Sequence, residues 1–156
     1  MISADLAGFI ESGVSILVGS RDASLLPECI HAAGARVEGG GAWLTVFLPL
    51  ATSATTVANL RENGRIAVTF SRPGDHRAVQ VKGRVAALRE GDEAAREAVE
   101  RHRGALARAL SVVGVPPRLT LRTTCWPCLE AQLHVEGVFL QTPGPGAGAP
   151  LATGSP

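Results

Sequence analysis

The sequence predicts a mainly β fold with flanking helices, in which six antiparallel strands close into a barrel. The clearest observation is the segment 59–88, which has the pattern of a helix end, a turn and two successive strands. Apolar and polar residues alternate along both strands, as a half-buried strand requires. Short connections between the predicted strands favour antiparallel neighbours, and about six such strands usually form a barrel. The chain of 156 residues is long enough for one domain with a sizeable core.

The first part of the chain predicts a short helix and two strands. Ser3 can cap a helix that ends at Gly13 and buries its apolar residues. These apolar residues are Leu6, Phe9 and Ile10. Residues 14–19 predict a short strand, and residues 27–38 predict a second strand with small side chains at 32–35. Small residues at these positions let another strand or a ligand approach the backbone closely.

The middle of the chain predicts a third strand, a helix and the central hairpin. Three glycines at 39–41 indicate a turn, and Pro49 closes the strand that follows at 42–48. Hydroxyl residues from Thr52 onward indicate the start of a helix that ends at residues 63–64. The hairpin strands flank a turn at 71–75, in which proline fixes φ and glycine accepts a positive φ.

The last part of the chain predicts a long helix, a final strand and a tail. Apolar residues recur at spacings of three and four between 92 and 113, so one face of this helix is buried. His102 lies on that face and is predicted to be a packed histidine. Residues 129–140 alternate again as a strand. We predict a barrel domain over 1–142 and a Gly/Pro-rich segment over 143–156, which is a tail or an arm that orders only against a partner.

Composition argues against several classes of function. The net charge is +1, from 15 basic and 14 acidic side chains, so the chain has no general attraction for nucleic acid or anionic membranes. Four Phe, two Trp and no Tyr offer few stacking platforms for single-stranded nucleic acid. No apolar run approaches the roughly 20 residues of a membrane span, and the N-terminus lacks the pattern of a signal peptide. We therefore expect a cytoplasmic protein.

The arrangement of these elements resembles the pyridoxamine 5'-phosphate oxidase-like, FMN-binding split-barrel family. The residues that carry the resemblance are NLRENGRIAVTFSRPGDHRAVQVKGRV at 59–85 and the strand–turn–strand–helix run at 30–56. The resemblance covers nearly the whole chain up to residue 141, in layout and in a loose signature. It implies a homodimer that binds FMN in clefts at the subunit interface and acts on a small molecule.

The resemblance also implies candidate residues for the FMN phosphate, which family members hold with basic side chains. Arg36 falls where one strand cation is expected, and His31 falls where an arginine is common. The start of the following helix often carries basic residues in the family, but here it carries Thr55 and Thr56. A phosphate contact loses a charge-assisted hydrogen bond, worth about 1.5–3 kcal/mol, wherever threonine replaces lysine.

The hydroxyl residues at this helix start have two interpretations. Thr52, Ser53, Thr55 and Thr56 can bind an anion together with the free N–H groups of the helix. They can equally be ordinary helix caps.

Three further candidates lie along the central hairpin. Ser71, Gln80 and Lys82 occupy the region that borders the flavin ring in the family. The plainer interpretation for Lys82 is a solvated strand face or a dimer contact.

The three cysteines invite other hypotheses. Cys125 and Cys128 form a C-x-x-C motif, but the motif precedes a strand, whereas redox motifs of this kind open a helix. Together with Cys29 and His31 the pair has the ligand types of a zinc site, although one C-x-x-C is only half a site. We expect three buried, inert cysteines, and we predict no metal.

The function that the sequence supports best is an FMN-binding flavoprotein, an oxidoreductase acting on a small molecule. No acid–base constellation is visible, and a flavin enzyme need not have one because the cofactor carries the redox step. The alternative is a non-catalytic barrel module that has lost flavin or binds another ligand.

Overall fold

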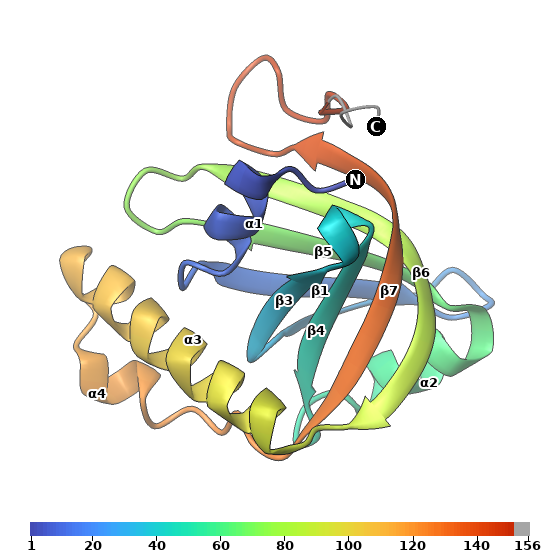
Figure 1. Ribbon diagram of the computed structural model, residues 1–156, viewed down its shortest axis with the longest axis horizontal. Coiled ribbons are helices and arrows are strands. Elements are labelled where there is room, and N and C mark those ends of the chain that lie inside the picture. The colour runs from blue at the N-terminus through green and yellow to red at the C-terminus, as the bar shows by residue number, and fades with distance from the viewer. Residues whose placement is uncertain (152–156) are drawn as a thin grey trace.

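The computed structural model describes residues 1–151 and contains one curled antiparallel sheet with helices on its outside (Figure 1). The strands are β1 (Ser15–Arg21), β2 (Pro27–His31), β3 (Gly34–Glu38), β4 (Trp43–Pro49), β5 (Arg65–Ser71), β6 (Ala78–Glu90) and β7 (Cys128–Leu140). The helices are α1 (Ala4–Ile10), α2 (Ala54–Asn63), α3 (Glu93–Val112), α4 (Pro117–Thr120) and the short η1 (Gly39–Gly41). None of these helices is long and apolar enough to cross a membrane.

The predicted fold class is confirmed, but the predicted count of six strands was wrong. The sheet has seven strands in the order β2-β1-β5-β6-β7-β4-β3. The segment predicted as one strand at 27–38 is two strands, because the chain changes partner at Ala32 and Ala33. The N–H of Ala32 donates to the carbonyl of Ile16 in β1, and that of Ala33 donates to the carbonyl of Phe47 in β4. The two end strands of the sheet are therefore joined by a bend, which closes the barrel.

Two groups of buried apolar residues flank this sheet. The larger group fills the barrel and includes Val18, Leu44, Val68 and Leu133, together with apolar residues of α1 and α2. The smaller group lies under α3. It consists of Ala33, Phe47, Ala95, Val99 and Cys128. The helix α3 therefore packs on one face of β4, and the side chains on the other face of β4 fill the barrel.

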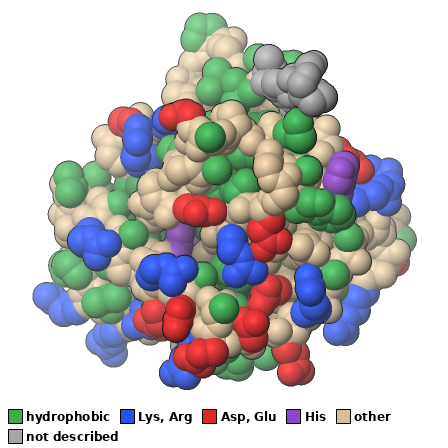
Figure 2. Space-filling view, in the orientation of Figure 1, with side chains coloured by type: hydrophobic (Ala, Val, Ile, Leu, Met, Phe, Trp, Pro, Cys, Tyr) green, Lys and Arg blue, Asp and Glu red, His purple; other side chains and the backbone are tan. Residues whose placement is uncertain are grey.

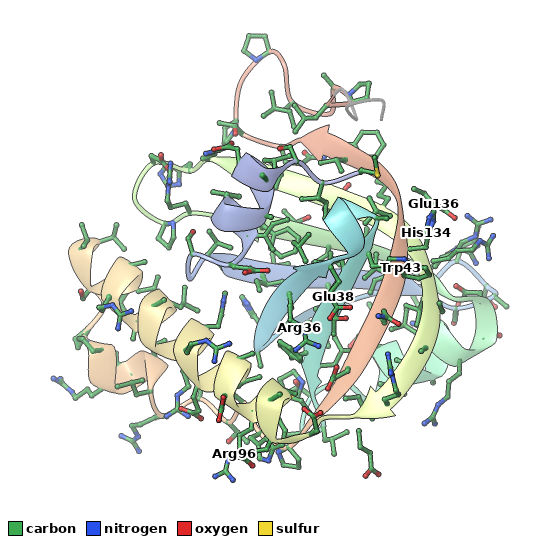
Figure 3. The ribbon with its side chains drawn as sticks, viewed as in Figure 1. Arg36, Glu38, Trp43, Arg96, His134 and Glu136 are labelled. Carbon is green, nitrogen blue, oxygen red and sulfur yellow. The ribbon has the colours of Figure 1, made fainter. Side chains whose placement is uncertain are left out.

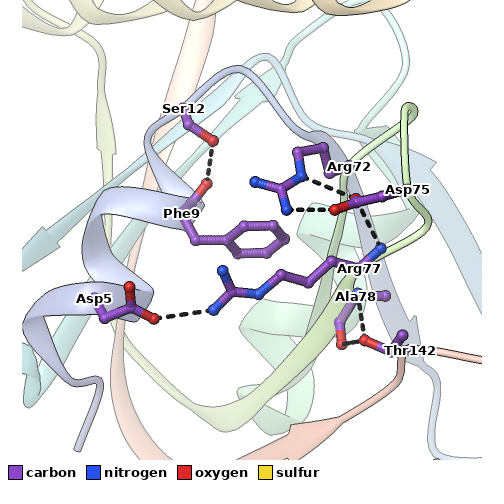
Figure 4. A network of polar contacts seen from close by, with 8 residues as sticks. All are labelled: Asp5, Phe9, Ser12, Arg72, Asp75, Arg77, Ala78 and Thr142. Carbon is purple, nitrogen blue, oxygen red and sulfur yellow. Dashed lines mark hydrogen bonds and ion pairs between the residues drawn. The ribbon is translucent and has the colours of Figure 1, made fainter. Parts of the chain in front are cut away.

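The N-terminal helix is attached to the central hairpin through Phe9. The guanidinium groups of Arg72 and Arg77 lie 5.6 and 4.6 Å from the centre of the Phe9 ring (Figure 4). Each arginine also pairs with a carboxylate, Arg72 with Asp75 and Arg77 with Asp5. Cation–π contacts of this kind stabilise by about 0.5–1 kcal/mol each at exposed sites. In the turn between β5 and β6, the residue with a positive φ is His76, at 59°, and not the glycine that the sequence suggested.

The end of the described chain returns along β7. The N–H of Leu151 donates to the carbonyl of Val138, and the N–H of Leu140 donates to the carbonyl of Ala149. The boundary at 142 between a domain and a tail stays a prediction, and residues 152–156 lie outside the described part of the chain.

We predict that Gly83→Ala destabilises the protein by about 1–3 kcal/mol, the usual cost of overpacking. A Cβ atom at Gly83 would lie 2.1 Å from the carbonyl oxygen of His134, because β6 and β7 shift register at this position. The matched control is Gly74→Ala, since a Cβ there has nothing within 4 Å. Urea unfolding of both variants measures the difference. Equal stability of the two variants would contradict the close approach of β6 and β7.

Candidate functional site

The bend at Ala32 and Ala33 forms the floor of a groove between the barrel and the chain around α3 and α4. Two adjoining cavities make up this groove, and they share His31, Ala32, Ala33, Thr123 and Cys125. We call the whole feature the bend groove. The cavities have volumes of about 350 and 360 Å³. Small-molecule sites typically have volumes of about 300–1,000 Å³, so the bend groove is large enough for a cofactor or a substrate.

The cavity next to α3, here called the helix cavity, combines an apolar wall with a few polar groups. Its apolar wall includes Ile16, Leu106 and Leu110. Its polar side chains are Ser15, His31, His102, Arg103, Thr120 and Thr123. Mostly apolar cavities with a small number of placed polar groups are typical of ligand sites.

The cavity toward the start of α2, here called the α2 cavity, brings together two residues that the sequence singled out. His31 and Thr52 both line it, although they are far apart in the chain. Both side chains are exposed. Further lining residues are Cys29, Ile30, Pro49 and Thr124. An imidazole and several hydroxyl groups can all hydrogen bond to an anionic oxygen.

His102 is packed between α3 and the barrel, as the sequence predicted. Its side chain is 6% exposed, and its Nε2 lies 2.9 Å from the carbonyl oxygen of Val14. A carbonyl only accepts, so Nε2 carries the hydrogen. Burial lowers the pKa of His102, and the hydrogen bond to Val14 only partly opposes this. The ring is therefore neutral, and its buried Nδ1 is an acceptor without a partner.

Arg103 is a residue of the helix cavity that the sequence did not single out. Its Nη1 lies 3.3 Å from a carboxylate oxygen of Glu100, and its Nη2 donates to the carbonyl of Leu121. Its Nε–H is buried and has no partner. Arg103 directly follows His102 in the sequence, and its contact with the chain after α4 makes it part of a cavity.

Cys125 and Cys128 are held in their protonated form. Burial raises the pKa of Cys128 to about 12, and the Cys128 thiol donates to the carbonyl of Cys125 at 2.7 Å. Burial also raises the pKa of Cys125, and the nearby Arg103 opposes this rise. The expectation that all three cysteines are buried was wrong for Cys29, which is exposed on β2, and for Cys125, which is half-buried. Within residues 1–151, no group of three His, Cys, Asp or Glu side chains is placed to hold a metal ion.

The interpretation of the hydroxyl residues at the start of α2 as caps does not hold for its N-cap residue. Ser53 is the N-cap residue, yet its side chain makes no capping hydrogen bond. Thr55 is exposed, whereas Thr56 is fully buried and its Oγ1 has no partner. Of the four hydroxyl residues predicted as an anion site, Thr52 alone is among the described residues that line the α2 cavity.

Arg36 is not part of the bend groove. Its Nε donates to Glu38 at 2.7 Å, and its Nη2 lies 3.5 Å from Glu130. Figure 3 shows Arg36 and Glu38 close together on β3. Arg36 lines a separate cavity of about 130 Å³, which Glu11 also lines. Two carboxylates therefore occupy the guanidinium that the resemblance assigned to phosphate.

The hairpin candidates also lie away from the groove. Gln80 donates to Thr69 at 3.0 Å, and Ser71 is half-buried at the end of β5. The ammonium of Lys82 lies 4.8 Å from the centre of the Phe139 ring. Lys82 also lines an open depression with Arg21 and Arg65, so three basic side chains meet on the outer face of the sheet. Elsewhere, basic and acidic side chains are interspersed over the lower half of the face shown in Figure 2.

Comparisons with known proteins identify the fold. No family model and no curated protein matches the chain. Among solved structures, HupZ from Group A Streptococcus has a TM-score of 0.59 at 17% identity, covering 96% of this chain and 99% of its own. A proposed pyridoxamine 5'-phosphate oxidase from Lactobacillus delbrueckii has a TM-score of 0.56 at 14% identity, covering 88% of this chain and 92% of its own.

An FMN-binding protein from Syntrophomonas wolfei is similar as well, with a TM-score of 0.56 at 12% identity. The match covers 96% of this chain and 85% of that protein. The chain therefore has the split-barrel fold of the pyridoxamine 5'-phosphate oxidase-like proteins, as the resemblance in sequence predicted.

We predict that His102 makes the protein less stable as the pH falls from 7 to 5. Its pKa is lower in the folded protein than the ordinary value of 6.5, so the unfolded chain binds the proton more readily in this window. The stability that this histidine contributes is complete above its unfolded pKa and is lost as the pH falls. Urea midpoints at pH 7 and pH 5 measure the loss, which should be smaller in His102→Gln. His134→Gln is the matched control, because His134 is exposed. The same loss in all three proteins would contradict the buried neutral ring.

Proposed function

We propose that the protein binds FMN in the bend groove, with the phosphate in the α2 cavity. The observation that carries this proposal is the meeting of His31 and Thr52 in one cavity of a split barrel. His31 and Thr52 are the residues that would hold the phosphate oxygens, helped by the N–H groups at the start of α2. The split-barrel FMN-binding protein from Syntrophomonas wolfei supports the choice of cofactor.

The finer proposal is an oxidoreductase that acts on a small molecule. A bound flavin supplies electron or hydride transfer, so the protein has to bind, orient and shield it. The apolar wall formed by Ile16, Leu106 and Leu110 would exclude water from the groove. We still propose that Ser71, Gln80 and Lys82 contact the flavin ring. Because these residues lie away from the bend groove, such contacts require a cofactor site that extends beyond it.

We also propose that the protein is a homodimer and that a second copy completes the cofactor site. The support is the exposed apolar surface of the β1–β2 hairpin beside His31. Leu25 and Leu26 are 67% and 68% exposed at its tip, and Leu17, the strand partner of His31, is 36% exposed. Light scattering at several concentrations measures the mass, and we expect Leu26→Glu to shift the protein toward the monomer. A monomeric wild-type protein at all concentrations would contradict the dimer.

A non-catalytic binding module is the second candidate. The observation that favours it is the lining of the α2 cavity, whose residues within the described chain include no lysine or arginine. A phosphate held without a cation gives up the stronger, charge-assisted hydrogen bonds. Purified protein that is colourless and does not bind added FMN would favour this candidate.

We predict that His31→Ala raises the Kd for FMN at least tenfold, equivalent to about 1.4 kcal/mol. The Kd for riboflavin should change less than twofold, because riboflavin lacks the phosphate that His31 would bind. Flavin fluorescence quenching measures both constants. The matched control is His134→Ala, which removes a histidine that contacts Trp43 on the outer face of the sheet. Equal losses for FMN and riboflavin would show that His31 does not contact the phosphate.

Arg36→Ala separates the two phosphate assignments. The resemblance implies a tenfold loss of FMN affinity in this variant. The ion pairs of Arg36 with Glu38 and Glu130 lead us to expect no loss. A loss confined to FMN would return Arg36 to the site and move the proposed phosphate position away from the α2 cavity.

A further inference from the structure

We propose that the depression on the outer face of β1, β5 and β6 binds a small molecule that carries a diphosphate group. Three cationic side chains line this hollow, which we call the basic depression: Arg21, Arg65 and Lys82. Glu136 is the one carboxylate among its lining residues in the described chain. The volume of the basic depression is about 330 Å³, which lies within the range of small-molecule sites.

The strand register places these cations around a floor of small residues. Gly19 in β1 lies opposite Ala67 in β5, and Ala67 lies opposite Lys82 in β6. Arg21 and Arg65 are two positions from Gly19 and Ala67 on the same strands, so their side chains leave the sheet on the same face. Glycine and alanine fill little of this face. The floor therefore lies below a rim of three charged side chains.

The three cations have hydrogen-bond donors to spare. Within residues 1–151, no carboxylate forms an ion pair with Arg21, Arg65 or Lys82. Arg21 donates from Nη1 to the carbonyl of Asp22 at 2.9 Å, which leaves its other N–H groups for a ligand. The ammonium of Lys82 is positioned over the ring of Phe139, at 4.8 Å from its centre. An anion in the basic depression would thus meet cations that no carboxylate of the described chain already neutralises.

The strand pairing also brings like charges together. Arg65 lies directly opposite Arg84 of β6, and like charges at opposed positions of an antiparallel pair are destabilising. Glu136 offsets the charge of Arg84, since its Oε1 lies 3.6 Å from Nε of that arginine. Arg65 has no such partner in the described chain. A bound anion would offset the repulsion that remains.

The charge and the side-chain types define the class of ligand. Three cations and one carboxylate leave an excess of two positive charges around the basic depression. The planar guanidinium group pairs with phosphate oxygens two at a time. A diphosphate group carries at least two negative charges in a compact volume, whereas a simple carboxylic acid supplies only one. The ligand is therefore a free diphosphate or a small molecule that ends in one, such as a nucleoside diphosphate.

The basic depression is separate from the proposed FMN site. Within the described chain, it shares no lining residue with either cavity of the bend groove. The proposal therefore does not rest on the proposed function. Lys82 is also a candidate for contact with the flavin ring, whereas Arg21 and Arg65 are not. The test accordingly uses a variant of Arg65.

The test is calorimetric titration of the purified protein with inorganic pyrophosphate in magnesium-free buffer. We expect one site per chain, and at least tenfold weaker binding of inorganic phosphate. A second titration with ADP distinguishes the two sources of the group. Tighter binding of ADP would identify a nucleoside diphosphate as the ligand, and tighter binding of pyrophosphate would identify a free diphosphate. Equal binding of phosphate and pyrophosphate, or no binding of pyrophosphate and ADP, would overturn the proposal.

Two variants locate the binding. Arg65→Gln should weaken binding of pyrophosphate at least tenfold. Arg108→Gln is the matched control, because it removes the same charge from an exposed position on α3 and should leave binding unchanged. Equal losses in these two variants would reveal a general attraction to positive charge and would overturn the site.

Gly19→Leu fills the floor of the basic depression without changing the charge. A Cβ atom at Gly19 has the carbonyl oxygen of Ala67 as its nearest neighbour, at an ordinary contact distance of 3.7 Å, so the strand accepts a side chain there. We expect this variant to bind pyrophosphate at least tenfold more weakly, which keeps the test decisive if Arg65→Gln does not fold. Undiminished binding by folded Gly19→Leu would overturn the assignment to this depression.

Titration with FMN separates this proposal from the proposed function. Pyrophosphate binding by a protein that ignores FMN would support the diphosphate site and remove the flavin function. FMN binding without binding of pyrophosphate or ADP would do the reverse. The affinity for FMN should not change in Arg65→Gln. A loss of FMN affinity in that variant would assign the basic depression to the flavin phosphate and overturn a separate diphosphate site.

Discussion

The change of strand partner at Ala32 and Ala33 is the interaction on which the rest of the structure depends. One backbone N–H bonds to β1 and the next bonds to β4, so consecutive residues join the two ends of the sheet. Sheet edges with unpaired backbone groups are a liability, and closure of the barrel removes that liability at this corner. Only small side chains allow it. A Cβ at Gly34 would lie 3.1 Å from the ring of Phe47 and 3.3 Å from Cβ of His102.

The same bend produces the bend groove. Ala32 packs against the core of the barrel, while Ala33 belongs to the cluster under α3. Phe47 draws α3 onto the outer face of the sheet, and His102 anchors that helix through Val14. The chain from α3 through α4 then crosses beside His31 and leaves a cavity on each side of it. Closure of the sheet and formation of the bend groove are thus consequences of one local geometry.

Much of this fold could be predicted from the sequence, and the failures have physical causes. Alternation along 65–88 and the apolar stripe of the long helix are local patterns, and both elements formed where they were predicted. The bend was hidden, because Ala32 and Ala33 suit a straight strand as well as a bent one. The sequence could single out His31 through the resemblance and Thr52 through its place at a helix start, but it could not show that they share a cavity. Arg103 lines the helix cavity because it contacts the chain after α4, which the sequence did not reveal. Arg36 forms ion pairs with Glu38 and Glu130, and the spacing of these residues in the sequence does not reveal the pairs.

Amide hydrogen exchange of the protein with and without FMN tests the central claim most directly. If the bend organises the cofactor site, FMN will slow exchange at residues 31–33 and at the start of α2. Exchange on the outer face around Arg21, Arg65 and Lys82 will change far less. Protection confined to that outer face, with none at the bend, would contradict the account.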